Sequence, residues 1–261
     1  MSSGRQNEAA SLALDRAEFG FGENETPVIK FGANLDIDTG TLPEDVWRQG
    51  GTYVFPTAAR VHAVISTSTA DTSAGTGMRT VHIYGLDANF VEQDEEVILA
   101  GVTPVNTLLS YLRVFRMVGI TAGTGGTNAG AVTATAATDA TVSAVIAIGI
   151  GQTQLALYTV PAGKRFLMEF FSASIIRDAG GAAAAQATVV LQTRDASLAA
   201  PCWNQKYETN LQITGSGNVA AGFPSVRYVF PAKTDIKATV TTVTDSNTGI
   251  EVLFAGFLRA A

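Results

Sequence analysis

The segments ARVHAVIS (59–66) and RTVHIYG (79–85) alternate two sets of side chains with a period of two residues. Successive side chains of a β-strand point to opposite faces, so this period predicts two strands that each bury one face. Similar short runs, divided by Gly, Pro, Asn and Asp, continue to the end of the chain, and long helical patterns are nearly absent. The sequence therefore predicts an all-β fold.

An approximate internal repeat relates two parts of the chain. YVFPTAARVHAVISTS (53–68) aligns with YTVPAGKRFLMEFFSAS (158–174), and TVHIYGLDA (80–88) aligns with TVVLQTRDA (188–196). Each copy has the order strand, Gly- or Ala-rich loop, strand and Asp-Ala turn. Strand-turn-strand segments of similar composition can also align by chance, so the repeat favours two similar units without requiring them.

The repeat predicts tandem β-sandwich or jelly-roll-like units of about 100 residues each. We expect an extended N-terminal arm at 1–34, a first β-sandwich unit at 35–142 and a second at 143–261. One larger sandwich is the alternative architecture. The first 30 residues hold too few periodic apolar positions to fold alone, so they either stay disordered or become ordered by docking.

Composition limits the classes of function. The chain has 261 residues, one cysteine and a formal net charge of -6, and its few basic residues are scattered, which disfavours nucleic-acid binding. No apolar run has the length of a signal peptide or a membrane span. The lone Cys202 in PCWNQ (201–205) predicts a small packed side chain in a protein that folds in a reducing cytoplasm.

The low proportion of charged residues is unusual for a soluble domain. Charged residues make up 15% of the chain, against about 25% in typical soluble domains. Either neighbouring subunits cover much of the surface, or the abundant hydroxyl groups make the protein soluble.

The glycine-rich stretch TSTADTSAGTGMRTVHIYGLDANF (67–90) raises the question of phosphate binding. A P-loop needs a Lys after its second glycine and a helix behind it, whereas Gly75 and Gly77 lack the Lys and precede a strand. The stretch therefore predicts a hairpin or surface loop in which glycine supplies a positive φ. GITAGTGGTNAGAV (119–132) is interpreted in the same way, as a flexible loop.

The two histidines, His62 and His82, occupy equivalent places in two strands that we expect to be neighbours. A zinc site would need a further ligand such as Asp71 or Asp87 at fixed geometry. Two histidines on the outer face of a sheet are more often solvated or hydrogen-bonded to neighbours. The sequence therefore predicts no metal site here.

Two acidic stretches call for the same comparison. Asp36 and Asp38 in LDIDTGTLPED (35–45) resemble a calcium loop, but the twelfth position is Trp47 instead of the required Glu. The four acids of VEQDEEV (91–97) would suit glycosidic acid-base chemistry, although a charged strand edge or turn is the favoured interpretation.

The remaining candidates are aromatic or nucleophilic. Trp47, Trp203, Tyr158 and Tyr207 would suit a sugar-stacking platform if they converge, and burial or packing at a subunit contact explains them equally well. No G-x-S-x-G elbow is present. The sequence predicts no enzyme, and no catalytic, cofactor-binding or metal-binding residue is assigned.

Several phrases of the sequence resemble a family of structural proteins encoded in the virion modules of tailed bacteriophages. The resemblance spans roughly residues 35–257. It rests on recurring phrases of the sequence and assigns no catalytic residue. The phrases are DIDTGT (36–41), DVW (45–47), GGTYVFPT (50–57), the stretch 67–90, RVFRMVGITAGTGGTNAG (113–130), LYTVPAGKRFLMEFF (157–171) and FPAKTDIKA (230–238).

This resemblance implies a β-rich capsid decoration or cement protein that acts by binding. Its expected partners are the major capsid protein and itself, as a homotrimer, with no nucleic acid and no membrane. Its expected location is the virion, assembled in the host cytoplasm. The alternative is a receptor- or glycan-binding module associated with the tail or a fibre.

Overall fold

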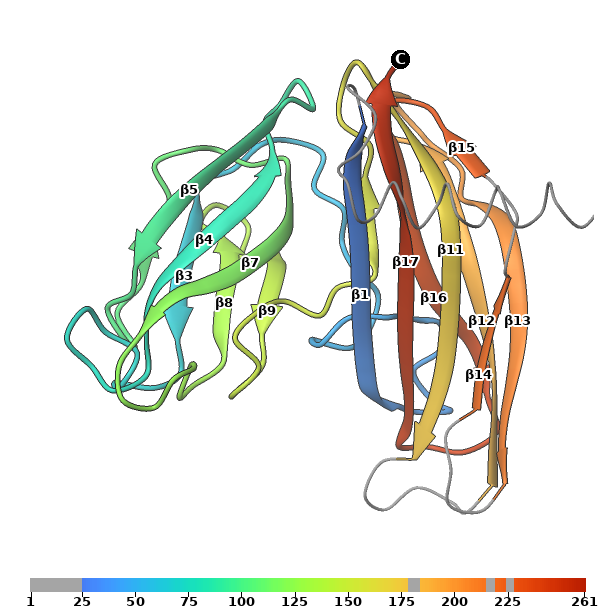
Figure 1. Ribbon diagram of the computed structural model, residues 1–261, viewed down its shortest axis with the longest axis horizontal. Helices are drawn as coiled ribbons and strands as arrows, with labels where there is room; N and C mark the ends of the chain where they lie inside the picture. Colours follow the sequence, from blue (N-terminus) through green and yellow to red (C-terminus); the bar gives the residue numbers. More distant parts are fainter. Residues whose placement is uncertain (1–24, 178–183, 215–218, 224–227) are drawn as a thin grey trace, which may run out of the picture.

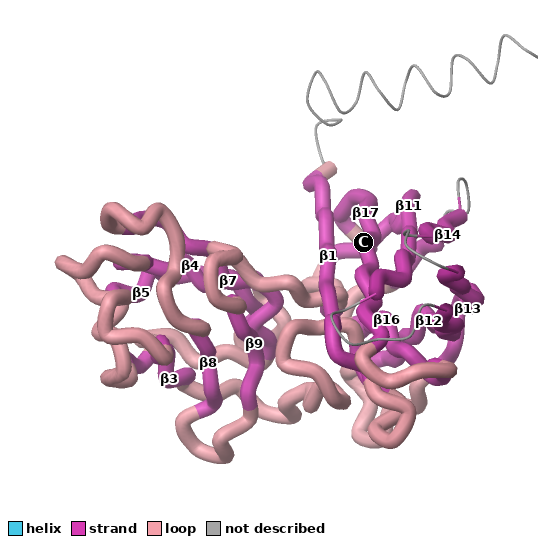
Figure 2. The backbone as a smooth tube through the Cα atoms, turned by 90° about the horizontal axis from the view of Figure 1, so that it is seen from below, coloured by secondary structure: helices cyan, strands magenta, loops and turns pink. Residues whose placement is uncertain are grey.

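The computed structural model describes residues 25–177, 184–214, 219–223 and 228–261. Strands connected by turns and loops build all of this part, which contains no helix, so the predicted all-β, sandwich-like fold is confirmed. Consequently, no helix within these ranges is long and apolar enough to span a membrane. Two groups of strands lie side by side and are joined by loops (Figures 1 and 2).

The larger group is a sandwich of two antiparallel sheets. One sheet has the order β1-β17-β11-β14, with β15 also pairing with β11, and the other has the order β10-β16-β12-β13, with β2 beside β16. Its strands are β1 (Thr26–Ile37), β2 (Glu44–Asp45), β10 (Leu157–Thr159), β11 (Lys164–Arg177), β12 (Ala184–Asp195), β13 (Asn204–Thr214), β14 (Val219–Phe223), β15 (Tyr228–Phe230), β16 (Thr234–Val243) and β17 (Thr248–Ala260).

The strand order identifies the topology of this larger sandwich. β14 and β15 pair with successive parts of β11 and together occupy one place. If this pair counts as one strand and the short β2 is left aside, the described strands follow the orders 1-8-3-6 and 2-7-4-5 along the chain. Eight strands in these two orders form a jelly roll, in which two Greek keys are folded together.

The smaller group is a second sandwich, with sheets of order β6-β3-β8-β9 and β5-β4-β7. Apolar side chains from both sheets meet in a core of their own around Val64, Ile83 and Met117. Its strands are β3 (His62–Ser66), β4 (Met78–Leu86), β5 (Glu92–Ile98), β6 (Val105–Asn106), β7 (Arg113–Ala122), β8 (Val132–Ala136) and β9 (Val142–Ile146).

The limits of the two units differ from the predicted ones. β1 lies partly within the predicted arm 1–34, yet it pairs with β17 over its whole length and so opens the jelly roll. The smaller sandwich is inserted between β1 and β10, and β9 extends past the predicted boundary at 142/143. Local strand patterns do not reveal a partner more than 200 residues away, which explains the difference. Residues 1–24 of the predicted arm lie outside the described residues.

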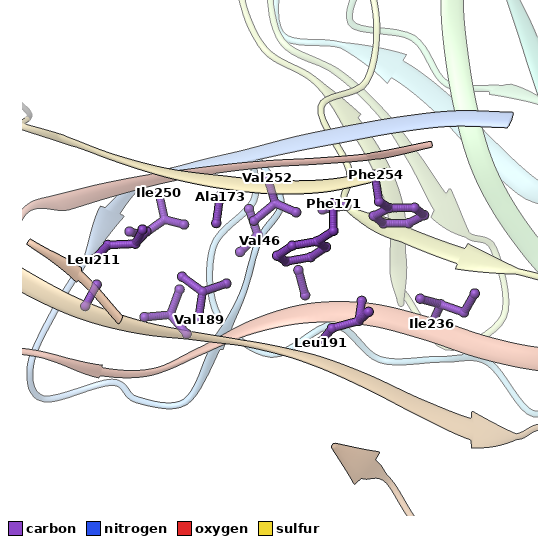
Figure 3. Packing of buried hydrophobic residues seen from close by; sticks show 14 of the residues in the cluster. Val46, Phe171, Ala173, Val189, Leu191, Leu211, Ile236, Ile250, Val252 and Phe254 are labelled. Carbon is purple, nitrogen blue, oxygen red and sulfur yellow. The ribbon is translucent and has the colours of Figure 1, made fainter. Parts of the chain in front are cut away.

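The core of the jelly roll forms because one face of each sheet is apolar. Side chains of β11 and β17, such as Phe171 and Phe254, point from one sheet toward Val189 and Leu191 on the other (Figure 3). All four are fully buried. Burial of apolar surface on this scale is the main driving force for stacking the two sheets.

The glycine-rich loop between β3 and β4 is organised by the buried carboxylate of Asp71. This carboxylate accepts hydrogen bonds from the Ser66 hydroxyl and from the backbone N–H groups of Met78, Ala129 and Gly130, at 2.6–2.9 Å. The loop is therefore a turn held from within, and no helix begins behind it that could bind a phosphate.

The predicted reason for the glycines in this loop is wrong. Gly75 and Gly77 do not have positive φ angles. A Cβ atom at Gly77 would lie 2.0 Å from Oδ1 of Asp71, and one at Gly75 would lie 2.0 Å from the carbonyl oxygen of Ala70. Close approach, and not backbone handedness, requires glycine at these two positions.

We predict that Asp71→Ala lowers the free energy of unfolding by about 3 kcal/mol, because it leaves two buried N–H groups and one partly buried N–H group without an acceptor. Chemical denaturation of the purified protein measures this loss. Asp36→Ala, which removes an exposed carboxylate, is the matched control and is expected to have a much smaller effect. Equal stability of the two variants would contradict the role assigned to Asp71.

Candidate functional site: a cavity between the two sandwiches

A cavity of about 500 Å³ lies where the two sandwiches meet. The smaller sandwich contributes the loop before β3, the β4–β5 turn and the start of β7, and the jelly roll contributes the end of β12 and the loop that follows it. Its lining residues are Phe55, Pro56, Thr57, Ala58, Ala59, Ala88, Phe90, Leu112, Arg113, Arg194, Ala196, Leu198, Ala199 and Pro201. The walls are therefore apolar except for two guanidinium groups and one hydroxyl.

The buried carboxylate of Asp235 joins the two sandwiches beside this cavity. Arg113 from β7 donates to both of its oxygens at 3.1–3.2 Å, and Nε of Arg194 donates at 2.9 Å. The Thr159 hydroxyl adds a fourth donor at 2.6 Å. Two guanidinium groups share one carboxylate, so the group keeps one positive charge in excess.

Aromatic rings contact the cations beside the cavity. The Arg194 guanidinium lies 4.9 and 4.5 Å from the ring centroids of Phe55 and Trp203, and these two rings also contact each other. Arg113 lies 5.2 Å from the Phe55 ring and 6.0 Å from Phe90. The electron-rich faces of the rings attract the cations, which fixes the planes of both guanidinium groups.

A second buried carboxylate, Asp45, holds another cation against the Trp203 ring. Nζ of Lys237 lies 2.8 Å from Oδ1 of Asp45 and 4.7 Å from the centroid of that ring. The backbone N–H of Tyr53 donates to the other carboxylate oxygen at 2.8 Å. Trp203 is therefore in contact with two cations, each of which is paired with a buried acid.

The two Asp-Ala turns of the predicted repeat both reach the cavity. Asp87 accepts hydrogen bonds from the backbone two and four residues later, and Asp195 accepts one from the backbone of Ser197. The alanines that follow, Ala88 and Ala196, line the cavity from the two sandwiches. In both copies the first strand of the repeat lies in one sheet and the second strand lies in the opposite sheet.

The lining can bind but offers little for proton transfer. Among the described residues that line the cavity, there is no carboxylate, imidazole or thiol. Arg194 uses Nε for Asp235, and its Nη groups donate to no other residue of the described part. The arrangement suits an anionic group attached to an apolar body, because a guanidinium fork binds carboxylate or phosphate while the walls exclude water.

The histidines do not lie together. His62 is on β3 and His82 on β4, and these strands belong to different sheets. Contrary to the predicted outer-face position, His62 is buried, donates through Nδ1 to the carbonyl of Arg60 and accepts at Nε2 from Ser143. Burial lowers its pKa. It is thus a neutral hydrogen-bonded core residue.

His82 lies on the other face of its sheet and pairs with Asp94 at 2.7 Å. Its ring stacks on Tyr84, with 4.4 Å between the centroids. Within the described ranges, no three His, Cys, Asp or Glu side chains cluster as metal ligands. Asp71, one suggested third ligand, is fully occupied by the loop described above.

The acidic stretches have structural partners. β5, which carries the acids of residues 91–97, is an edge strand, as expected for a charged edge. Glu95 accepts hydrogen bonds from the backbone N–H groups of Leu108 and Leu109. At the suggested calcium loop, Asp38 accepts a hydrogen bond from the backbone N–H of Asn247, and Asp36 is exposed.

The four aromatic residues do not form a sugar-stacking platform. Tyr158 is buried against Phe115 and Phe166, and Tyr207 packs on Phe171. Trp47 is buried as well and only Trp203 reaches the vicinity of the cavity. These rings belong to the protein interior or its margin.

The prediction that Cys202 is a packed side chain is wrong, because the cysteine is exposed. It follows Pro201 in the loop at the rim of the cavity. The apolar neighbours in its sequence pack elsewhere, so the composition of the pentapeptide did not indicate its exposure.

Sequence reasoning missed Arg113, Arg194 and Asp235. Arg113 and Asp235 are 122 residues apart, and no local spacing connects them. One signal was available: Asp235 and Lys237 stand in an otherwise apolar and hydroxyl-rich strand, and charges in a central strand require buried partners.

Comparison with known proteins does not identify a ligand or a function for the site. No family model matches the sequence, and no curated protein matches it. Among solved structures, "Structure of infectious bursal disease virus Gx strain" aligns with 92% of this chain and 77% of its own, at 10% identity and a TM-score of 0.20. A similarity this low carries no argument about the fold or the function.

We predict that Asp235→Asn lowers the free energy of unfolding by about 3 kcal/mol, because the buried guanidinium of Arg113 and the half-buried guanidinium of Arg194 lose their counter-charge. Thermal or chemical denaturation measures the change. Asp36→Asn makes the same substitution at an exposed position and is expected to leave stability nearly unchanged. A loss no larger than that of the control would show that Asp235 does not hold the two sandwiches together.

A second titratable group lies between the sandwiches. Lys30 on β1 is buried, donates from Nζ to the carbonyl of Phe115 on β7 and lies 5.8 Å from that ring. Burial, helped by the nearby positive charge of Arg116, lowers the pKa of Lys30 from 10.5 to about 7. Its charged form is therefore disfavoured in the folded protein.

This pKa predicts a rise in stability between about pH 7 and pH 10. In this interval the unfolded chain keeps the Lys30 proton and the folded protein has released it, so the free energy of unfolding increases with pH. Denaturation curves at several pH values measure the slope. The slope is expected to fall in Lys30→Met and to stay in Lys206→Met, an exposed lysine. Identical slopes in all three proteins would contradict the lowered pKa.

Proposed function

We propose that this chain is a structural protein of a bacteriophage virion, a capsid decoration or cement protein that acts by binding. Its partners are the major capsid protein and two further copies of itself in a homotrimer. The jelly-roll topology is compatible with this proposal, since viral capsid domains use it, although lectins and cupins use it too. The observation that carries the proposal is an apolar surface on the jelly roll.

This surface, the outer apolar face, lies on the side of the β1-β17-β11 sheet that points away from the core. Cross-strand pairing arranges its side chains in rows, and Ile29, Phe170 and Val229 on it are 62%, 44% and 56% exposed. The three rows are Pro27-Phe257-Leu167-Val229, Ile29-Ala255-Phe170 and Phe31-Leu253-Ser172.

The outer apolar face is as large as the largest apolar patch on many monomeric proteins, and such a patch is often functional. Strand and residue spacings give three rows across up to four strands an area on the order of 300–400 Å². Contiguous apolar patches of this size commonly mark interaction sites. A standard interface buries roughly 800 Å² per partner, so this face supplies part of a contact and other surfaces complete it.

Incomplete contacts of this kind suit a lattice protein. Each copy on a shell is held near several neighbours, so a weak contact acts at high effective concentration and the contacts reinforce one another. The low proportion of charged residues, 15%, fits a chain much of whose surface is covered after assembly. The aromatic residues do not converge, so no observation favours the glycan-binding alternative.

Replacing Ile29 and Phe170 together by Gln tests the proposal. Both side chains are exposed, so the fold is expected to persist, while burial energy at the interface is lost. We expect the double variant to trimerise and to bind undecorated capsids at least about tenfold more weakly, as measured by ultracentrifugation and co-sedimentation.

Leu108→Gln, at an apolar residue that is 92% exposed on the smaller sandwich, is the matched control and should bind normally. Wild-type binding by the double variant would remove the outer apolar face from the interface. A wild-type protein that stays monomeric and does not bind undecorated capsids would refute the decoration function. Electron microscopy of intact virions would show whether the chain is part of the particle.

A further inference from the structure

We propose that the cavity between the sandwiches is the binding site for an acidic, apolar stretch within residues 1–24 of this same chain. The stretch LALDRAEFGFGEN (12–24) places Asp15 and Glu18 among Leu14, Phe19 and Phe21. This inference stands apart from the proposed function, because it concerns two parts of one sequence and its test contains no capsid.

The two guanidinium groups that line the cavity favour the binding of a negative charge. Arg113 and Arg194 share Asp235, which leaves one positive charge in excess. The Nη groups of Arg194 donate to no other described residue, and its guanidinium lies against the rings of Phe55 and Trp203. A carboxylate can accept two parallel hydrogen bonds from such a fork, and the buried setting strengthens them.

The walls require an apolar neighbour on each side of that charge. Phe55 and Phe90 are 9% exposed, and small or apolar side chains form most of the remaining lining. An inorganic anion would pair with the guanidinium groups but would leave the apolar walls in contact with water. A carboxylate flanked by leucine and phenylalanine satisfies both parts of the cavity.

The stretch 12–24 has this composition. It carries three acidic residues against one arginine and includes two phenylalanines and two leucines. The clustered acids of β5 are a poorer match, since Glu95 already holds a loop and Asp94 pairs with His82.

The start of β1, where the described part of the chain begins to pair, lies near the cavity. Thr26 at the start of β1 pairs with Leu258, and Lys164 of β11 pairs with Ala260 on the same strand. Two residues before Lys164, the N–H of Ala162 donates to the carbonyl of Phe90 on the cavity wall. β1 and β11 are two strand spacings apart, which is about 10 Å. The six residues that follow Glu18 span about 20 Å when extended. Glu18 is thus within reach of the cavity.

Disulfide trapping in the full-length protein tests this placement. Cys202 is the only cysteine of the chain, is exposed and lies beside Pro201 at the rim. A second cysteine is introduced in turn by Ala13→Cys, Ala17→Cys or Gly20→Cys, and the protein is oxidised mildly. A disulfide forms only when the two Cβ atoms approach to about 4 Å. We expect at least one position to cross-link at least tenfold faster than the control.

The control is Thr124→Cys, an exposed position beyond the end of β7 opposite Arg113, which reports random collisions. A competing acceptor, Ser172→Cys in a Cys202→Ser background, places the thiol on the outer apolar face. Non-reducing gels separate a cross-link within one chain from a cross-link between two copies. Only the product within one chain supports the inference, because the exposed Cys202 residues of two copies can also pair with each other. A product formed only between copies would overturn it.

The charge requirement is tested in the fastest cross-linking variant. Adding Asp15→Asn and Glu18→Gln should slow the reaction about tenfold, the loss expected for a charge-assisted hydrogen bond. Ala199→Trp, which fills the cavity, should slow it similarly, whereas Ala100→Trp, at an exposed site two residues after the end of β5, should not. Rates equal to the Thr124→Cys control, or faster trapping at Ser172→Cys, would overturn the inference.

Discussion

The relative position of the two sandwiches depends on one buried carboxylate. Asp235 is fully buried and accepts hydrogen bonds from Arg113 of the smaller sandwich and from Arg194 and Thr159 of the jelly roll. Buried ion pairs often contribute little net stability, because desolvation offsets the attraction between the charges. They do exclude other arrangements, since any shift would leave a charge without its partner. The cavity, its ring-stacked cations and its excess charge all follow from this constraint.

The sequence revealed strands better than it revealed their partners. Alternation in RTVHIYG correctly separates buried Val81 and Ile83 from their neighbours. In ARVHAVIS the alternation is also real, but the buried set is His62, Val64 and Ser66. His62 and Ser66 are tolerated inside because Ser143 and Asp71 satisfy their hydrogen bonds. A period of two does not show which set is buried when polar residues have such partners.

Long-range pairing explains most of what the sequence could not provide. The strands β1 and β17 come from opposite ends of the chain, so their pairing, and with it the limits of the predicted units, left no local signal. The candidate site has the same origin, because Arg113, Arg194 and Asp235 stand in three separate segments. The Asp-Ala turns were visible as a repeat, but only the folded chain brings both of them to one cavity.

The path of the chain between the two sandwiches is narrow. The outgoing and returning segments run side by side, with Trp47 bridged to Leu155 and the N–H of Arg48 bonded to the carbonyl of Gln154. The chain therefore leaves the jelly roll and returns to it through two adjacent, hydrogen-bonded segments. Changes of length within the insert can therefore leave the strand register of the jelly roll intact, provided that the insert keeps Arg113 beside the buried Asp235.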